Sequence, residues 1–408
     1  MIPYADALKL LLAESRALDD EWCRCSEAYS RVLAEPMHAP RALPPFTNAA
    51  MDGYALASDG KVLAAGSEYE VGGLIAAGAP PPANAESKVW EITTGAALPA
   101  GLDCIVPLER VERLEGGRIR LRAALSGGQN VRQRGSDIAI GAQVGAVGQR
   151  VDPALRMMLA ALGIDRIKVR RRPRVALLST GAELVADPAL PLGEGQIYAA
   201  NASYLQTSLH AMGAEVIANE ALGDDAQAFT AQLRALASRA DIVVSTGAVS
   251  MGRHDFIPAS LRAADARLLF HKVAIRPGKP VLAACLQHGP LFIGLPGNPI
   301  AAAVGFRFFV VPVLRAMLGM PQEVPLRVPL LEPVQVTAGL RRFYKARLRR
   351  SDSLGLGVEL LEGQESYRIG SLLRANAWAV MNEDANEFPP GALVDVLPRD
   401  AGGGWFID

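Results

Sequence analysis

Between residues 173 and 320, short apolar runs alternate with longer segments in which apolar residues recur every three or four positions. The short runs predict β-strands at Val175–Ser179, Glu215–Asn219, Ile242–Ser245, Arg267–Phe270, Val281–Ala284 and Leu291–Gly294. The longer segments predict helices at Ala202–Met212, Asp225–Ser238 and Pro299–Leu318. This alternation predicts a doubly wound α/β domain with a mainly parallel sheet.

The flanking regions have different patterns. Residues 46–140 contain short alternating runs such as KVWEITTG and RIRLRAAL, which predict a β-rich inserted domain. Residues 321–408 predict a small β-barrel-like domain, with strands at Phe343–Leu348, Trp378–Met381 and Leu393–Leu397. Residues 1–45 and 141–172 predict a mixed domain that links the others. It opens with an amphipathic helix and contains a second helix that Asp152 caps, Pro153 starts and Gly163 ends.

Composition narrows the possible functions. A chain of 408 residues is long enough for several domains. Lys and Arg total 42, as do Asp and Glu, so no overall field attracts nucleic acid or an anionic membrane. The basic run Lys168–Arg174 is either a solvated face that joins domains, which we favour, or a nucleic-acid patch.

The spacing of the cysteines and the length of the apolar runs indicate a location in the cell. The four cysteines form no CxxC pair and have no metal-ligand spacing, which favours free thiols in a reducing compartment. His254 and His271 lack a third ligand at a spacing that suits zinc. No run approaches the roughly 20 apolar residues that span a bilayer, and the N-terminus lacks the features of a signal peptide. We therefore expect a cytoplasmic protein without membrane contact.

Three glycine-containing loops follow predicted strands of the α/β domain: LLSTGAEL, VVSTGAVSMG and FIGLPGNP. Ligands of open α/β sheets bind beyond the C-terminal ends of strands, where free N–H groups suit phosphate or another oxyanion. Each loop alone is also an ordinary βα turn, and none matches a dinucleotide or P-loop motif. The candidate ligand-binding residues in these loops are Ser179, Thr180, Gly181, Ser245, Thr246, Gly247, Ser250, Pro296, Gly297, Asn298 and Pro299.

Charged residues accompany these loops. In HKVAIRPGKP, strand alternation would place Lys272 and Arg276 on one face, while Gly278 and Lys279 lie in a stiff turn. The segment is either a compact anion site or a solvated charged face. The carboxylates Glu183, Asp224, Asp225 and Asp255 could hold Mg²⁺ or accept hydrogen bonds from a heterocycle, although Asp225 and Asp255 are also placed to cap helices.

One further polar segment lies far upstream. PPFTNAAMDGYAL, residues 44–56, has no periodicity and contains Asn48, Met51 and Asp52. An Asx-turn would account for Asp52 and Gly53 locally.

Together these segments resemble the molybdopterin molybdotransferase family, known as MoeA in bacteria and as the E domain of gephyrin. The matching segments are FTNAAMDGYA, ITTGAALPAGLDCIVPLE, NVRQRGSDI, LLSTGAEL, GQIYAAN, VVSTGAVSMGRHD, HKVAIRPGKP and GLPGNPIAAAVGF, with a weaker match at RIGSLLRANAWAVM. They occur in family order over nearly the whole chain.

The resemblance implies an elongated homodimer with molybdopterin bound by residues 173–320. It makes residues 1–45 and 141–172 the linking and dimerisation domain. The inserted domain would lie over the partner subunit, so that Asp52 and Thr94 complete a site with Glu183, Asp255 and Lys279 of the other chain. The implied reaction inserts molybdate into adenylylated molybdopterin and releases AMP, with Mg²⁺. An adenylyltransferase or a recipient molybdoenzyme would be further partners.

The resemblance also assigns roles. The catalytic residues would be Asp52, Glu183, Asp255, Lys272 and Lys279. Glu183, Asp224 and Asp255 would hold the metal. Thr94, Asp137, Asp225, Arg276 and Gly278 would join the loop residues in binding the ligand.

Several positions depart from the family pattern. Ala182 replaces an acid, Ala199 and Ala200 replace the acid and hydroxyl of IYDSN, and Thr246 and Ala248 replace glycines. Two hypotheses follow: an active molybdotransferase, which we favour, and a divergent paralogue that carries molybdopterin without full transferase activity. A third, an adenylyl-transferring or nucleotide-processing enzyme, fits the flanking regions poorly.

Overall fold

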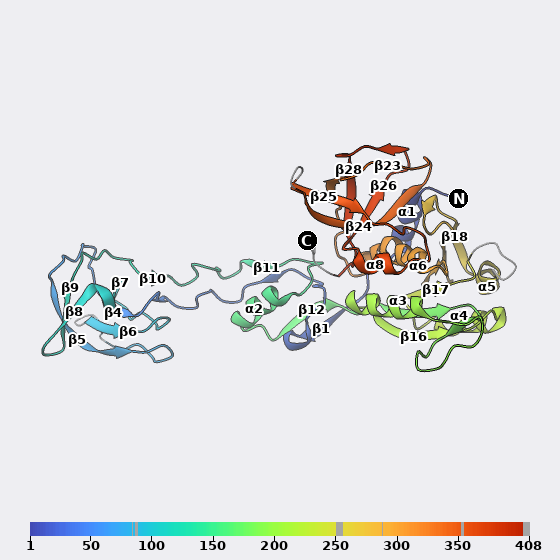
Figure 1. Ribbon diagram of the computed structural model, residues 1–408. Coiled ribbons are helices and arrows are strands. Elements are labelled where there is room, and N and C mark those ends of the chain that lie inside the picture. The colour runs from blue at the N-terminus through green and yellow to red at the C-terminus, as the bar shows by residue number, and fades with distance from the viewer. Residues whose placement is uncertain (84, 86–88, 250–255, 288, 352–354, 403–408) are drawn as a thin grey trace.

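The computed structural model describes residues 1–83, 85, 89–249, 256–287, 289–351 and 355–402. The described chain is elongated (Figure 1). The β-rich inserted domain lies at one end, the α/β and C-terminal domains lie together at the other, and the linking segments run between them. Residues that are distant in the sequence therefore meet at one end, whereas the insert stands apart.

The α/β domain contains a six-stranded sheet in the order β16-β13-β17-β21-β20-β18. Strands β16, β13, β17 and β21 are parallel, and β20 is antiparallel to both β21 and β18. This confirms the predicted, mainly parallel sheet. The strands are β13 Arg174–Ser179, β16 Glu215–Ala221, β17 Ile242–Thr246, β18 Arg267–His271, β20 Leu282–Cys285 and β21 Leu291–Leu295, and β14 Leu184–Val185 pairs separately with β15 Ile197–Tyr198.

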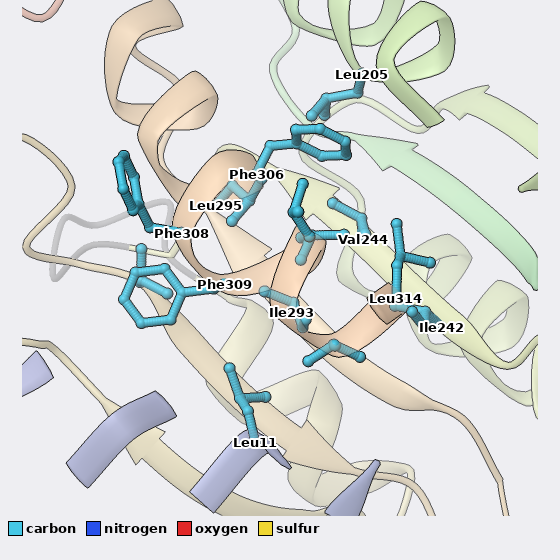
Figure 2. Packing of buried hydrophobic residues seen from close by; sticks show 14 of the residues in the cluster. Leu11, Leu205, Ile242, Val244, Ile293, Leu295, Phe306, Phe308, Phe309 and Leu314 are labelled. Atoms are coloured by element: carbon cyan, nitrogen blue, oxygen red, sulfur yellow. The ribbon is translucent and has the colours of Figure 1, made fainter. Parts of the chain in front are cut away.

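Strand alternation divides the core between the two faces of this sheet. Val244 and Ile293 face a cluster that includes Leu205 of α3 (Ala200–Ala211), part of which is shown in Figure 2. The neighbouring residues Val243 and Phe292 face the other cluster, against α4 (Ala226–Leu236) and α5 (Ile257–Ala263). Both faces are buried, which explains why these strands are continuous apolar runs.

The predicted helix Pro299–Leu318 is one helical segment with a π-turn in its middle. It comprises α6 (Pro299–Gly305), the π-turn η4 (Phe306–Val310) and α7 (Val311–Met317). Pro312 has no N–H to donate to the carbonyl of Phe308 four residues earlier, and the Tyr4 hydroxyl donates to that oxygen instead, at 3.1 Å. Within the described chain, Pro299–Met317 is the single helix long and apolar enough to cross a membrane, but 83% of its apolar window is buried inside the protein. It is a core helix.

The inserted domain is a six-stranded sheet in the order β7-β4-β6-β5-β9-β8. Tyr54 and Leu56 of β4, the strand next to the edge strand β7, are buried in its core. The strands are β4 Gly53–Leu56, β5 Glu68–Ile75, β6 Val89–Ile92, β7 Cys104–Pro107, β8 Val111–Leu114 and β9 Arg118–Leu121, with the 3₁₀ turn η3 at Leu108–Arg110. The chain passes into and out of the insert through β3 (Asn48–Ala49) and β10 (Val131–Arg132), which pair with each other.

The linking segments hold short paired strands and helix α2, whereas α1 packs through Ala7 and Leu11 into the core of the α/β domain (Figure 1). Helix α2 begins where predicted, because the side chain of Asp152 accepts a hydrogen bond from the Leu155 amide at 2.8 Å. The basic run joins domains, since Arg171 pairs with Asp241 of the α/β domain at 2.7 Å. The elements are α1 Tyr4–Glu14, β1 Asp20–Arg24, η1 Cys25–Glu27, β2 Met37–His38, β11 Gln143–Gly145, α2 Pro153–Ala161 and β12 Arg166–Arg170.

The C-terminal domain is a curled sheet in the order β19-β24-β26-β28-β22, with β25 also paired to β24. Strand β19 (Ile275–Arg276) comes from the α/β region and pairs in parallel with β24, which connects the two domains. The other elements are β22 Leu326–Pro329, β23 Val334–Gln335, β24 Arg341–Ser351, β25 Gly355–Leu360, α8 Gly370–Arg374, β26 Ala377–Met381, β27 Glu387–Phe388 and β28 Leu393–Pro398.

Candidate functional site

A cavity of about 680 Å³ lies at the C-terminal ends of β13, β17 and β21. We call it the main cavity. This is the edge where ligands of open α/β sheets bind. The predicted ligand-binding residues that line it are Ser179, Thr180, Thr246, Gly247, Pro296, Gly297, Asn298 and Pro299. All three glycine-containing loops therefore contribute to one cavity.

The two STGA loops are joined directly to each other. The backbone N–H of Thr180 donates to the carbonyl of Thr246 at 2.9 Å, and the Thr180 hydroxyl donates to the same oxygen at 3.1 Å. Gly247 has φ +91°, and a Cβ there would lie 2.5 Å from the carbonyl oxygen of Thr180. Only glycine fits at that crossing, so the two loops form a single rigid wall.

Thr246 and Ala248 both shape this wall. The Thr246 hydroxyl donates to the hydroxyl of Ser179 at 3.3 Å, which is a further bond between the loops. Ala248 has φ +48°, in the left-handed region that favours glycine. An L-residue there costs about 1 kcal/mol, so Ala248 strains the backbone beside the cavity.

Glu183 is the one carboxylate among the described residues that line the main cavity. Gly181 precedes it with φ +141°, and a Cβ at that position would lie 2.6 Å from a Glu183 carboxylate oxygen. The glycine thus makes room for the acid to fold back over the loop. In the STGAEL sequence, the glycine and the acid act as one structural unit.

The other predicted acids lie elsewhere. Asp224 is exposed in the turn after β16. Asp225 caps α4 and accepts hydrogen bonds from the amides of Gln227 at 2.8 Å and Ala228 at 3.0 Å. Asp255, like Ser250, lies outside the described residues. Within the described residues there is no group of three His, Cys, Asp or Glu side chains that could hold a metal ion. Glu183 alone would suit Mg²⁺, which often uses one or two protein carboxylates with substrate phosphates and water.

The prediction that Lys272 and Arg276 share one face of a strand is wrong. Strand β18 ends at His271, and Lys272 takes φ +72°. The chain then folds into a tight loop in which the Val273 amide donates to the carbonyl of Lys279 at 2.9 Å. Arg276 pairs with β24 of the C-terminal domain. Left-handed backbone at Lys272 ends the alternation that the prediction assumed.

Among the described residues, Lys272, Arg276 and Lys279 consequently lie outside the lining of the main cavity. In the described structure, Pro280 is the residue of HKVAIRPGKP that reaches the lining. Gly278 takes φ +106°, and a Cβ there would press on Ile275 at 3.1 Å. Ser245 is fully buried within β17 and lies behind the cavity wall.

Two polar side chains that were not predicted as site residues, His271 and Asn201, position the lining. His271 Nε2 lies 2.8 Å from the carbonyl oxygen of Val249, which ties β18 to the second STGA loop. Asn201 Nδ2 donates to the carbonyl of Gly297 at 2.7 Å. Asn201 ends the GQIYAAN segment, so that segment was the signal for it.

The C-terminal domain also reaches the cavity, through Tyr367 and Ile369. The segment that carries them is held by Lys345, which is 0% exposed. The Lys345 ammonium donates to the carbonyls of Gly363 at 2.6 Å, Arg368 at 3.1 Å and Glu365 at 3.5 Å. Burial lowers the pKa of Lys345 to about 8. No sequence pattern indicated this contribution.

Asp52 and Thr94 meet in the inserted domain. Asp52 Oδ1 accepts hydrogen bonds from the Thr94 amide at 2.6 Å and from the Thr94 hydroxyl at 2.9 Å. These two bonds, the backbone bond first, lower the pKa of Asp52. The pair is exposed and lies at the opposite end of the chain from the main cavity (Figure 1). Asp137 is exposed in a bend after β10, and its amide donates to the carbonyl of Leu43 at 3.0 Å.

Family models match three successive segments of the chain. They describe the MoeA N-terminal region (domain I and II) at residues 2–163, a probable molybdopterin binding domain at residues 176–316, and the MoeA C-terminal region (domain IV) at residues 327–398. These segments include the insert, the main cavity and the C-terminal sheet.

Whole proteins are similar over the same length. A molybdopterin molybdenumtransferase from Synechococcus elongatus is 36% identical over 97% of this chain and 99% of its own. One from Haemophilus influenzae is 32% identical over 93% of both chains. A crystal structure of a molybdopterin biosynthesis MoeA protein from Pyrococcus horikoshii superposes with a TM-score of 0.81 at 29% identity, over 97% of this chain and 99% of that one. The chain belongs to the MoeA family.

Proposed function

We propose that this chain is a molybdopterin molybdenumtransferase that inserts molybdate into adenylylated molybdopterin and releases AMP. The observation that carries the proposal is the joined pair of STGA loops, which places Glu183 and the ends of two parallel strands around one cavity. The full-length relatives that bear the same name support it.

In this reaction the dithiolene sulfurs replace oxo ligands of molybdenum, and water cleaves the phosphoanhydride. The loop N–H groups would bind the phosphate oxygens of the substrate. Glu183, together with Asp255, would hold a Mg²⁺ ion, which would supply positive charge to the diphosphate. Lys272, Arg276 and Lys279, which flank the lining at Pro280, would offset the charge of phosphate and molybdate at longer range.

The site would be shared between two subunits of a homodimer. Asp52 and Thr94 form a preorganised acceptor at the far end of the chain from the main cavity. They are exposed, and their loop has no periodicity that would explain its polar residues. A second chain whose insert lies over the cavity of the first would bring Asp52 to Glu183 and Lys279 of its partner. A cytoplasmic location fits the free cysteines.

The direct test is an assay with purified protein, adenylylated molybdopterin, molybdate and Mg²⁺. We expect molybdate-dependent release of AMP and formation of molybdenum cofactor, and we expect EDTA to abolish both. Binding of the pterin without AMP release would reject the transferase and favour the carrier hypothesis. This outcome has a physical basis, because Ala248 strains the cavity wall and Ala199 and Ala200 contribute only methyl groups to it.

A further inference from the structure

A second, smaller cavity of about 310 Å³ adjoins the main cavity. We call it the side cavity. It lies between the start of α3 and the end of β16, the edge strand of the sheet. The two cavities share a wall that includes Tyr198, Ala199 and Ala200. Two of these residues carry only a methyl group, so the partition between the cavities is thin.

The described side chains around the side cavity include no cation. Glu220 is its one charged lining residue, but strand alternation turns the Glu220 carboxylate to the opposite face of the sheet, where Oε1 accepts a hydrogen bond from Gln232 of α4 at 2.7 Å. A cavity that offers no cation to phosphate or molybdate suits a neutral occupant, unlike the diphosphate that the loops of the main cavity suit.

Polar groups in the lining suit the edge of a heterocycle. Asn219 of β16 and Gln206 of α3 both line the side cavity, and Asn219 Nδ2 donates to Gln206 Oε1 at 2.8 Å. A bonded pair of amides always leaves one carbonyl oxygen and one amino group for a ligand, whichever way the amides are turned. Adjacent donor and acceptor groups match those on the edge of a purine or a pterin. The ring of Tyr198 adds an aromatic surface to the shared wall.

The volume of the side cavity also suits a heterocycle. Drug-sized ligands occupy pockets of about 300–1,000 Å³, and the side cavity lies at the lower limit of that range. A fused-ring heterocycle fits a cavity of this size. The main cavity, at about 680 Å³, has room for the remainder of a larger molecule.

We propose that the side cavity binds one heterocycle of the substrate, through the Asn219–Gln206 amide pair, while the diphosphate lies in the main cavity. The proposal rests on the proposed function, because adenylylated molybdopterin carries a fused-ring nitrogen heterocycle at each end. Adenine and the pterin share the required donor and acceptor edge. Ala199 and Ala200 let the ligand pass from one cavity to the other.

Two variants of the full-length protein test this assignment. Asn219→Ala removes half of the amide pair, and Ala221→Phe fills the side cavity from the end of β16 without altering the lining of the main cavity. Gln227→Ala is the matched control, since it removes an exposed amide that lines neither cavity. Calorimetric titration with AMP, 6-hydroxymethylpterin and ribose 5-phosphate measures heterocycle and phosphate binding separately.

We expect both variants to weaken binding of AMP or of the pterin by about tenfold, the loss of one two-point contact. Ribose 5-phosphate should bind the wild-type protein and the three variants with the same affinity. Loss confined to AMP identifies adenine as the occupant, and loss confined to 6-hydroxymethylpterin identifies the pterin. The proposal fails if neither heterocycle binds the wild-type protein, if neither variant weakens it by more than about twofold, or if ribose 5-phosphate is weakened equally.

The rate of AMP release distinguishes a failure of the side-cavity assignment from a failure of the proposed function. If the wild-type protein releases no AMP from adenylylated molybdopterin, the proposed function fails, whatever the titrations show. If the wild-type protein turns over, the two variants should raise KM for adenylylated molybdopterin and leave kcat near the wild-type value. Unchanged KM in both would overturn the side-cavity assignment alone.

Discussion

The loops around the main cavity and the Asp52–Thr94 pair occupy opposite ends of the same chain (Figure 1). At the cavity, a parallel sheet aligns the ends of β13, β17 and β21, so residues far apart in the sequence meet within one subunit. In the insert, Asp52 bonds the amide and the hydroxyl of Thr94, far from the described lining of the main cavity. The first region contains most of a site, whereas the second contains an exposed acceptor that needs a partner. This difference favours a site assembled between subunits.

The largest loss of activity is expected from a change in the main cavity. Glu183→Gln removes the carboxylate that the described lining supplies, and we expect the rate of AMP release to fall by about a hundredfold or more, the usual effect of losing a group that stabilises transition-state charge. The residue is exposed, so the free energy of unfolding should not change. The matched control is Glu194→Gln, an exposed acid that does not line the main cavity. Equal rates for the two variants would remove Glu183 from the site.

The insert end should give a smaller but clear loss. Asp52→Asn keeps the shape of the side chain and removes its charge, and we expect AMP release to fall by about tenfold to a hundredfold. Asp59→Asn, at another exposed acid of the insert, should leave the rate unchanged. A normal rate of AMP release by Asp52→Asn would mean that Asp52 takes no part in the reaction. It would contradict a site that combines residues from the two ends of the molecule.

A third prediction concerns how the C-terminal domain joins the cavity. Lys345→Met removes the ammonium that holds the segment bearing Tyr367 and Ile369. We expect KM to rise by about tenfold, equal to about 1.4 kcal/mol, with little change in kcat. Lys345→Arg, which keeps donors for the same carbonyls, should recover part of the affinity. An unchanged KM in Lys345→Met would mean that this segment does not touch the substrate.

The same variant gives a pH signature. Burial lowers the pKa of Lys345 to about 8, from 10.5 for the free side chain. Between these values the unfolded chain binds more protons at this residue, so its contribution to stability rises with pH and is lost as pH falls through about 8. Urea unfolding across that window should show this rise in the wild-type protein, and the rise should be absent from Lys345→Met.

The smallest effect is expected at Ala248. Its φ of +48° suits glycine, so Ala248→Gly should stabilise the protein by up to about 1 kcal/mol. Urea unfolding measures the change, and Ala189→Gly in an exposed loop is a control that should not gain stability. A loss of stability in Ala248→Gly would show that the loop is not strained at this residue.

The sequence was most informative where local pattern and structure agree. Buried parallel strands read as apolar runs, and Asp152 and Asp225 cap helices at the predicted positions. The STGA loops were placed correctly because the C-terminal ends of parallel strands share one edge of the sheet.

Predictions failed or were silent where the decisive feature is not local. Nothing in HKVAIRPGKP indicates that Lys272 turns left-handed or that Arg276 joins the sheet of another domain. The buried Lys345 looks like any strand lysine, and its role depends on three carbonyls supplied by residues 363–368. The side cavity likewise depends on Asn219 and Gln206, whose partnership arises only when α3 packs beside β16.

The central claim is that Asp52 of one subunit completes the cavity of the other, and complementation tests it most directly. Asp52→Asn and Glu183→Gln chains, each nearly inactive alone, are unfolded, mixed in equal amounts and refolded together. A site shared between subunits predicts one intact site in each mixed dimer, and recovery of about a quarter of the wild-type rate for random pairing. No recovery, in samples shown by tagged-chain capture to contain mixed dimers, would contradict the shared site.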